Sequence, residues 1–367
     1  MKVSHFGQIQ PICPVCRLSE RGPSPLVVAS VLQGDANEIT FGLIHCQHDS
    51  CRMEYPIIDG IPVIHSNVRG QIDAYLLHLI AREDLPAEIE SLISDAAGPG
   101  SAYDSMKQTM SSYVWDHYED REQGSTGAVQ PATSIESKHQ PGSASRCLNQ
   151  ALDLLQHQPE GLSLDLGCAA GGTTFTLAEK MPGLVLGVDL NLSLLRVAAR
   201  VLREGRVVYP MRQGGVVYER REISVMPQGG DRVDFWCCDA LCLPFSAETF
   251  GVVSALNVLD CVSSPLKLLQ EVELFLVSDG VLAVCCPYDW SPAATPVEGW
   301  LGGHSQRGGQ QGDSAQILEA ILTPDALPAS LERLKMMVSR PNVPWSVRVH
   351  SRSYAEYRVH LVLAGKT

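Results

Sequence analysis

The order of apolar and polar positions divides the second half of the chain into alternating strand-like and helix-like segments. Short apolar runs, typical of strands buried on both faces, alternate with longer segments whose apolar residues recur at helical spacing. The predicted strands are 163–166, 184–188, 233–237, 251–255 and 281–285, and the predicted helices are 146–157, 173–180, 192–204 and 265–276. Gly205 follows the third helix and is placed to end it. This alternation indicates a parallel sheet with crossover helices.

The end of the chain has a different pattern. Apolar residues occupy alternate positions from 345 to 349 and again from 357 to 363, on either side of Ser351-Arg352-Ser353. A period of two is typical of strands, so we expect a final antiparallel hairpin.

The segment ahead of the α/β pattern is helical and then irregular. Apolar residues at helical spacing between 71 and 93, broken at Pro86, predict two helices. A third helix is expected around 105–120, where aromatic residues such as Tyr113 either cover a site as a lid or pack on the main domain. Residues 121–145 are rich in Gly, Ser, Pro and Gln and lack apolar periodicity. The expected units are a small domain (1–66), a helical connector or lid (67–120), a flexible linker (121–145) and the main domain (146–367).

A glycine-rich turn follows the first strand of the main domain, in residues 164–177. Gly167 and Gly171 allow close approach of a ligand and positive φ. A dinucleotide site would need Gly where Ala169 stands, and a phosphate loop would need a following Gly-Lys-Ser/Thr. Asp165, just before the turn, is unfavourable for a phosphate but suits a cofactor with an ammonium group, of which S-adenosylmethionine is one.

This segment resembles the class I methyltransferase signature, acid-x-Gly-x-Gly-x-Gly, with alanine in the middle glycine position. The resemblance implies an α/β, Rossmann-like domain with a mostly parallel seven-stranded sheet and a terminal antiparallel hairpin, and it implies S-adenosylmethionine as cofactor. Asp189, at the end of the second strand, is placed to accept the ribose hydroxyls. In the family an acid after the third strand contacts the adenine amino group, and Asp239 matches it. Each acid would otherwise cap the following helix. The predicted cofactor-binding residues are Asp165, Gly167, Cys168, Ala169, Gly171, Asp189, Leu190, Asp239, Ala240 and Asn257.

The loops after the fourth and fifth strands hold the candidate substrate and catalytic residues, because ligands bind at the carboxyl ends of parallel strands. After the fourth strand, where the family faces the methyl group, the chain has neither Asn/Asp-Pro-Pro-Tyr nor Pro-Cys, so Asn257 and Asp260 are candidates to orient cofactor or substrate. The predicted substrate contacts are Asp260, Trp290 and Trp300, and the predicted catalytic residues are Tyr288, Asp289 and His304. The loop from 287 to 303 would otherwise be structural, with buried tryptophans.

This loop, together with residues 343–348, resembles the methyltransferase domain of ovothiol synthases, which methylates an imidazole nitrogen of mercaptohistidine. The resemblance spans about residues 160–365 and implies N- or O-methylation of a small molecule, a heterocycle among the candidates. RNA or a translation protein is the alternative substrate, because seven arginines lie between Arg196 and Arg221, in and before an insert at 206–231. That insert would otherwise be a solvated hairpin. A catalytically silent cofactor-binding scaffold is the third hypothesis.

Two cysteine pairs near the start indicate a metal site. Cys13 and Cys16 have the usual two-residue gap of a zinc ribbon, whereas Cys46 and Cys51 are separated by four residues. His45 or His48 would replace a cysteine if the wider loop cannot close. Residues 55–63 then predict a strand pair around an Asp-Gly turn. Residues 10–65 resemble the small zinc-ribbon activator subunit of tRNA and translation-factor methyltransferases, which implies structural zinc; a metal-free core of packed cysteines is the alternative.

Composition limits the partners. The net charge of −13 over 367 residues argues against a surface that grips DNA throughout. The chain has no run of eighteen apolar residues and no signal-peptide core at its start, so we expect a cytoplasmic protein without a membrane partner. Most of the other cysteines lie in apolar runs and are expected to be buried and free.

Overall fold

The computed structural model describes residues 1–367 except 21, 69, 72–93, 95–96, 122–138, 156 and 308. The predicted helices between 71 and 93 and most of the predicted linker lie outside the described residues. No described helix is long and apolar enough to cross a membrane.

The main domain is built on a mostly parallel sheet, as predicted. Its strands lie side by side in the order β9-β6-β5-β10-β11-β13-β12, and the first five run parallel to one another. β13 is antiparallel to both β11 and β12, which gives the terminal hairpin. The strands are β5 (Leu162–Leu166), β6 (Val185–Asp189), β9 (Val233–Cys238), β10 (Phe250–Leu256), β11 (Leu276–Cys286), β12 (Leu334–His350) and β13 (Ser353–Lys366).

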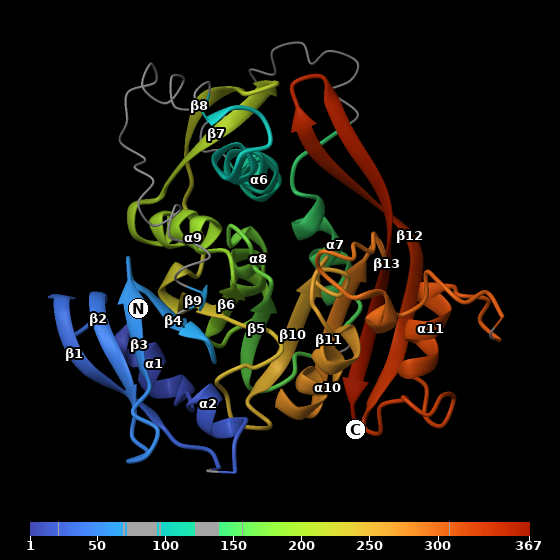
Figure 1. The fold of residues 1–367 in the computed structure, drawn as a ribbon, viewed down its shortest axis with the longest axis horizontal. Coiled ribbons are helices and arrows are strands. Elements are labelled where there is room, and N and C mark those ends of the chain that lie inside the picture. The colour runs from blue at the N-terminus through green and yellow to red at the C-terminus, as the bar shows by residue number, and fades with distance from the viewer. Residues whose placement is uncertain are drawn as a thin grey trace.

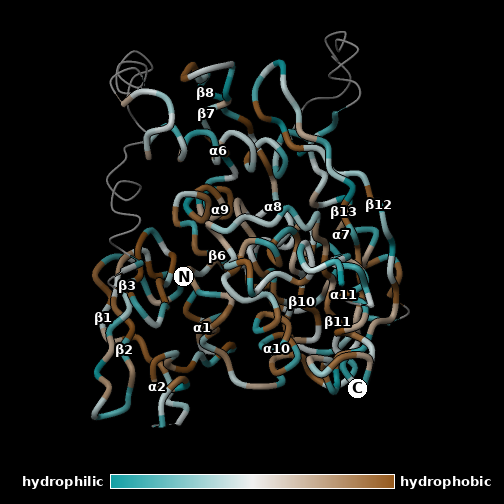
Figure 2. Tube along the Cα trace, turned by 45° about the vertical axis from the view of Figure 1, so that its right-hand side comes forward, coloured by the Kyte–Doolittle hydropathy of each residue, from teal (hydrophilic) through white to brown (hydrophobic). Residues whose placement is uncertain are grey.

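Helices cover both faces of this sheet. The helices are α7 (Ser143–Leu152), α8 (Gly172–Lys180), α9 (Leu192–Glu204), α10 (Pro265–Phe275) and α11 (Ser314–Ile321), with short 3-10 turns at η2 (Gly230–Arg232) and η3 (Val297–Gly299). One apolar core includes the inward faces of α7, α8 and α9, and a second includes those of α10 and α11. Figure 2 shows apolar residues concentrated in the strands and on these helices. Gly205 ends α9 in the left-handed conformation, as predicted.

Two details differ from the sequence-based expectation. Strand β11 begins at Leu276, five residues before the predicted start at 281, with a register shift against β10 and a φ of 61° at Asp279 in this first part. Helix α7 ends at Leu152, five residues earlier than the periodicity indicated.

The N-terminal segment extends the same sheet. It contains α1 (Val3–Ile9), α2 (Pro14–Arg17), β1 (Leu26–Gly34), β2 (Ile39–Cys46), β3 (Glu54–Ile58) and β4 (Ile61–Ile64). Asp59 and Gly60 both have positive φ in the tight turn between β3 and β4, in agreement with the predicted strand pair. β4 pairs in parallel with β9, so no gap in the sheet separates this segment from the main domain.

Helix α6 (Ala102–Tyr118), followed by η1 (Glu119–Arg121), lies beyond the carboxyl ends of the parallel strands. Figure 1 shows it between two hairpins, β7 (Arg206–Gly214) with β8 (Val217–Ser224) on one side and the far end of β12 and β13 on the other. The predicted insert is therefore a hairpin that forms its own two-stranded sheet. Together these elements close the space above the strand ends.

Candidate functional site

The glycine turn between β5 and α8 has an unusual backbone. Gly167, Ala169 and Gly171 have φ values of 67°, 48° and 86°. A Cβ on Gly167 would lie 2.4 Å from Cγ2 of Val258, and one on Gly171 would lie 2.7 Å from the Phe235 ring. Gly167 and Gly171 are therefore required by the packing of Val258 and Phe235 against the turn, whether or not a ligand also approaches it.

Asp165, a predicted cofactor-binding residue, lines neither of the two cavities described below. Its carboxylate is buried and accepts hydrogen bonds from the hydroxyls of Thr173 (2.7 Å), Thr174 (2.8 Å) and Ser254 (2.7 Å). Burial raises the pKa of Asp165, and the three hydroxyl donors oppose this shift. Asp165 therefore ties β5 to the first turn of α8 and to β10, and its influence on a cofactor is indirect.

Helix α6 and η1 contact the glycine turn directly. The Gly172 N–H donates to Nδ1 of His117 (2.8 Å), and the Tyr118 hydroxyl donates to the Ala170 carbonyl. Burial, assisted by the charge of Arg121, lowers the pKa of His117 to about 3, so this imidazole is neutral. Trp115 is also buried and packs against Tyr354, whereas Tyr113 is 44% exposed and lines the cavities described next. The aromatic helix is thus both a structural cover and a wall of the site.

A first cavity, of about 230 Å³, lies at the carboxyl ends of β5, β6, β9 and β10. Most of the predicted cofactor-binding residues line it, namely Gly167, Ala169, Asp189, Leu190, Asp239, Ala240 and Asn257. Cys168 and Gly171 do not line it, because the Cys168 side chain is buried and Gly171 packs on Phe235. We call this space the cofactor cavity.

Hydrogen bonds and an ion contact from neighbouring protein groups fix the two acids of the cofactor cavity, Asp189 and Asp239. Asp189 accepts the N–H groups of Ala169 (2.9 Å) and Asn191 (2.7 Å). Burial raises the pKa of Asp189, and these N–H groups oppose the shift. Asp239 accepts the Leu241 N–H (2.9 Å) and lies 3.6 Å from Nε2 of His65, the residue after β4. Burial alone would raise the pKa of Asp239, but the hydrogen bonds from His65 and Leu241 outweigh it and the pKa is lowered.

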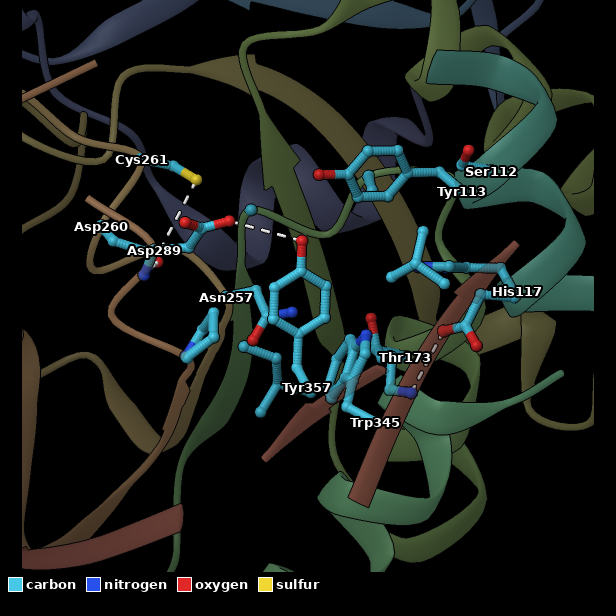
Figure 3. A pocket seen from close by; sticks show the side chains of 17 residues that line it. Ser112, Tyr113, His117, Thr173, Asn257, Asp260, Cys261, Asp289, Trp345 and Tyr357 are labelled. Atoms are coloured by element: carbon cyan, nitrogen blue, oxygen red, sulfur yellow. Dashed lines mark hydrogen bonds between the residues drawn. The ribbon is translucent and has the colours of Figure 1, made fainter. Parts of the chain in front are cut away.

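A second cavity, of about 250 Å³, adjoins the first, and we call it the substrate cavity. The residues that line both are Tyr113, Gly167, Ala169, Leu256, Asn257 and Cys261. Two predicted site residues, Asp260 and Asp289, line the substrate cavity, with Trp345 and Tyr357 from the terminal hairpin. Figure 3 shows the Tyr113 ring extending from α6 and the hydrogen bond from the Tyr357 hydroxyl to Asp289 (3.3 Å).

The other four residues predicted in the loop after β11 line neither cavity. Tyr288 has a φ of 58°, and its hydroxyl lies within hydrogen-bond distance of Nδ1 of His360 (2.8 Å). Trp290 and Trp300 stack on each other with ring centroids 6.0 Å apart. His304 is exposed and bonds Ser305.

Both indole N–H groups of that stack are satisfied within the protein. Trp290 donates to the Ser314 hydroxyl (3.0 Å), and Trp300 donates to the Thr295 carbonyl (2.8 Å). The stacked tryptophans therefore stabilise the loop through contacts within the protein, in agreement with the alternative interpretation that this loop is structural.

Asn257 lies where the two cavities meet and has the features of a ligand-contacting residue. Its φ is 55°, and its N–H donates to the Cys285 carbonyl (2.7 Å). Its side-chain oxygen is buried and has no hydrogen-bond partner among the residues that the structure describes. A buried acceptor without a donor is costly, so this oxygen fits the ammonium group that S-adenosylmethionine carries. Together with the acids Asp189 and Asp239, it makes the residues present compatible with that cofactor.

The predicted basic insert is held by internal ion pairs and hydrogen bonds. Arg221 pairs with Glu119 (3.0 Å) at the end of α6, and Arg206 pairs with Glu222 (3.0 Å). Nη1 of Arg212 bonds Gln108 of α6 (3.1 Å). The arginines therefore fix the β7–β8 hairpin to helix α6, and nothing in the described part of the insert favours nucleic acid.

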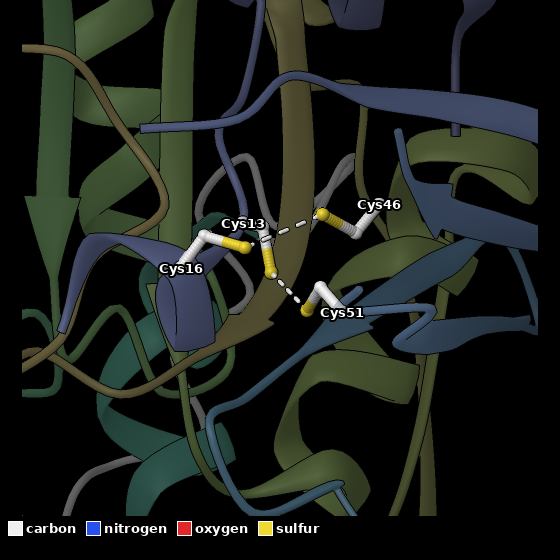
Figure 4. Close-up of side chains that lie close together, drawn as sticks. All are labelled: Cys13, Cys16, Cys46 and Cys51. Carbon is white, nitrogen blue, oxygen red and sulfur yellow. Dashed lines mark hydrogen bonds between the residues drawn. The ribbon is translucent and has the colours of Figure 1, made fainter. Parts of the chain in front are cut away.

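The four N-terminal cysteines converge, as predicted, without His45 or His48. Their Sγ atoms all lie within 4.8 Å of one another. Cys13 Sγ is 3.8 Å from Cys51 Sγ, and Cys16 Sγ is 3.6 Å from Cys46 Sγ (Figure 4). Zn–S bonds of about 2.3 Å in a tetrahedron place the sulfur atoms about 3.8 Å apart. The cluster therefore has the donors and the size of a tetrahedral zinc site.

One comparison with known proteins assigns a family to part of the chain. Residues 164–284 match the family model of a methyltransferase domain. No curated protein matches the chain. Among solved structures, the chain is similar to the [4+2]-cyclase SpnF, with a TM-score of 0.41 and 16% identity over 62% of this chain and 83% of that one. It is also similar to phosphoethanolamine N-methyltransferase 2 of Haemonchus contortus, with a TM-score of 0.30 and 21% identity over 38% of this chain and 27% of that one.

The assignment rests on the family model and on the site, since these structural similarities are weak. The matched segment runs from β5 to β11 and contains the glycine turn and the strand ends that carry Asp189 and Asp239. Residues 164–284 are a class I S-adenosylmethionine-dependent methyltransferase domain.

Proposed function

We propose that this chain transfers a methyl group from S-adenosylmethionine to a nitrogen or oxygen atom of a small molecule bound in the substrate cavity. The observation that carries the proposal is the contact between the two cavities, which share Gly167, Ala169, Asn257 and Cys261. A cofactor in one cavity and an acceptor in the other would meet at this shared wall.

The chemistry asks little of the side chains. S-adenosylmethionine supplies a methyl group on a sulfonium, and displacement needs mainly an acceptor held in line with it. Proximity of this kind is worth effective molarities of about 10⁵ to 10⁸ M. Tyr113 and the terminal hairpin enclose the substrate cavity and can hold a small acceptor against the glycine turn.

The test is a labelled-product experiment. The purified protein is incubated with S-adenosylmethionine carrying a labelled methyl group and with a cell extract fractionated by size. We expect label in a small molecule and no label when boiled protein is used. Label in RNA or protein would contradict the proposal, and binding of the cofactor without any labelled product would instead favour a silent scaffold.

We also propose that Cys13, Cys16, Cys46 and Cys51 hold one structural zinc ion. Their separations support this, and α2 and the loop after β2 are short elements that a metal would fix. Metal analysis of the purified protein should give about one equivalent of zinc, and the Cys16→Ser, Cys46→Ser variant should give none. Less than about half an equivalent in the wild type would contradict a filled site.

A further inference from the structure

The described residues that line the substrate cavity leave it with negative charge. They include Asp116, Asp260 and Asp289, and no lysine or arginine. His117 is neutral, as shown above. Asp116 has its charge compensated by the N-terminus of α7, because its two oxygens accept the N–H groups of Ser143 (2.8 Å) and Ala144 (3.1 Å) in the first turn of that helix. Two carboxylates, Asp260 and Asp289, therefore face a ligand.

Asp260 and Asp289 form a pair. The Asp289 N–H donates to Oδ2 of Asp260 (2.8 Å), which fixes the two residues relative to each other. Asp260 is only 4% exposed, whereas Asp289 is exposed and accepts the Tyr357 hydroxyl. An ionised carboxylate has about four acceptor sites, so both retain capacity for a donor on a ligand. Burial raises the pKa of Asp260, so its ionised form is costly unless a cation accompanies it.

Aromatic side chains form another part of the wall, and one of them, Tyr357, hydrogen-bonds Asp289. Trp345 and Tyr357 are directly opposite each other on β12 and β13, and Tyr113 reaches the cavity from α6 (Figure 3). Ring faces attract cations, and aromatic rings together with carboxylates are the usual recognition set for organic ammonium groups.

We infer that the substrate is a small molecule with a protonated amine, bound through its ammonium group by Asp260 and Asp289 and through its carbon skeleton by Tyr113, Trp345 and Tyr357. This inference rests on the proposed function, since the amine nitrogen is then the methyl acceptor. Anionic substrates such as phosphate esters are excluded by the same charges.

The reaction balances with these residues. The ammonium group loses one proton to the carboxylate of Asp289, which is exposed and can release it to water. The freed nitrogen lone pair forms the bond to the methyl carbon while the carbon–sulfur bond breaks and leaves its electron pair on sulfur. The products are an N-methylated ammonium ion and S-adenosylhomocysteine.

Three probes of matched size test the inference. Phenethylamine, 2-phenylethanol and phenylacetate present a cation, a neutral hydroxyl and an anion on the same ring. Each is titrated into the wild-type protein saturated with S-adenosylhomocysteine, so that no turnover occurs, and binding is followed by calorimetry. We expect phenethylamine to bind at least about tenfold more tightly than 2-phenylethanol, because charge-assisted hydrogen bonds are roughly twice as strong as neutral ones. Phenylacetate should bind most weakly.

Two variants test whether Asp260 and Asp289 cause the preference for phenethylamine over 2-phenylethanol. Asp260→Asn and Asp289→Asn keep the size of each side chain and should each remove most of the preference for the amine. Asp325→Asn is the matched control, because Asp325 is exposed, lines neither cavity and has a left-handed backbone that Asn tolerates. It should bind all three probes like the wild type.

The outcomes separate the inference from the proposed function. If the cofactor binds but phenethylamine binds no more tightly than the alcohol, or no probe binds, the substrate class is wrong and the proposed function stands. If Asp260→Asn and Asp289→Asn weaken binding of S-adenosylmethionine instead of the amine, the carboxylates serve the sulfonium and the inference is overturned. If the wild type does not bind S-adenosylmethionine, the proposed function itself fails.

Discussion

The cofactor cavity and the substrate cavity share a wall but are built differently. The cofactor cavity is bounded by residues at the ends of the parallel strands or directly after them, such as Gly167, Asp189 and Asp239. The substrate cavity draws Tyr113 from α6, Trp345 from the terminal hairpin and Asp289 from the loop after β11. The first depends on local strand-to-turn geometry, whereas the second depends on how distant segments pack.

This difference determines what a substitution should do. A change at a strand end removes a contact to the cofactor and leaves the substrate wall in place. A change in the hairpin, α6 or the loop after β11 should alter the acceptor and leave cofactor affinity intact. Each substitution below tests whether the two cavities are separable in this way.

The largest effect is expected for Asp189→Ala. In its predicted role Asp189 accepts two ribose hydroxyls. Loss of this charged acceptor, together with loss of the acceptor for Ala169 N–H, should remove about 3 kcal/mol, or roughly a hundredfold in affinity. Calorimetry with S-adenosylmethionine measures this, and Asp153→Ala, an exposed acid outside both cavities, is the control. Unchanged affinity in Asp189→Ala would place the cofactor elsewhere.

Asp165→Ala should act on stability rather than on the cofactor. It leaves the buried hydroxyls of Thr173, Thr174 and Ser254 without their common acceptor, which costs about 2 to 3 kcal/mol of unfolding free energy. Denaturant unfolding measures the loss. Cofactor affinity of the folded protein should change less than about threefold, a much smaller loss than that of Asp189→Ala. A hundredfold loss of affinity with normal stability would restore the direct cofactor contact expected from the sequence.

Most residues that the sequence predicts for the cofactor line one cavity, because strand ends are visible in the sequence. A buried apolar run that stops at an acid marks the end of a strand, and Asp189 and Asp239 were predicted in this way. Asp165 lies one residue before the end of β5, on a face covered by α8, and the pattern of the sequence does not distinguish this position from the strand end.

The substrate cavity was predicted only in part, for physical reasons. Asp289 and Asp260 follow strands and were found, whereas Trp345 and Tyr357 were recognised only as alternating hairpin residues. The alternation of apolar positions around Trp345 and Tyr357 shows that they lie in strands, but it does not show that a cavity separates them from α6. Trp290 and Trp300 line neither cavity, and the sequence could not show this, because a tryptophan in a loop has the same sequence pattern whether its indole N–H bonds a ligand or, as here, the protein.

A smaller effect is expected for Asp289→Asn on the rate with phenethylamine. Loss of a general base should lower the rate about tenfold or more at pH 7, since such bases contribute about 10²-fold or more when fully used. The difference from the wild type should narrow as the pH approaches the pKa of the amine, because more of the amine is then already neutral. Steady-state rates between pH 7 and 10 measure this. A deficit that is constant across this range would mean that Asp289 only positions the substrate.

The dependence of cofactor affinity on pH should be several-fold and should follow Asp189. Burial raises the pKa of Asp189, so its carboxylate is protonated at a higher pH than an ordinary aspartate as the pH falls. The pKa of Asp239 is lowered, so Asp239 stays ionised over the same range. Affinity for S-adenosylmethionine should therefore decrease from pH 7 to pH 5 in the wild type and in Asp239→Asn, but not in Asp189→Asn. If the decrease in affinity between pH 7 and pH 5 were lost in Asp239→Asn and kept in Asp189→Asn, the pH dependence would belong to Asp239 and the prediction would be wrong.

The smallest effect is expected for His65→Ala, which tests whether the cofactor cavity depends on strand ends of the main domain alone. His65 follows β4 of the N-terminal segment and lies 3.6 Å from Asp239, and in the same segment Gln71 donates to the Leu190 carbonyl (2.8 Å). The cofactor cavity therefore receives support from outside residues 164–284. A partly exposed ion pair of this kind is worth about 0.2 to 1 kcal/mol, so affinity for S-adenosylmethionine should fall about two- to fivefold. His157→Ala, at an exposed position outside both cavities, is the control. If His65→Ala binds the cofactor like the wild type, the strand ends of the main domain are sufficient to build this cavity. A measurable loss of affinity would mean that the N-terminal segment influences cofactor binding through the contact between His65 and Asp239.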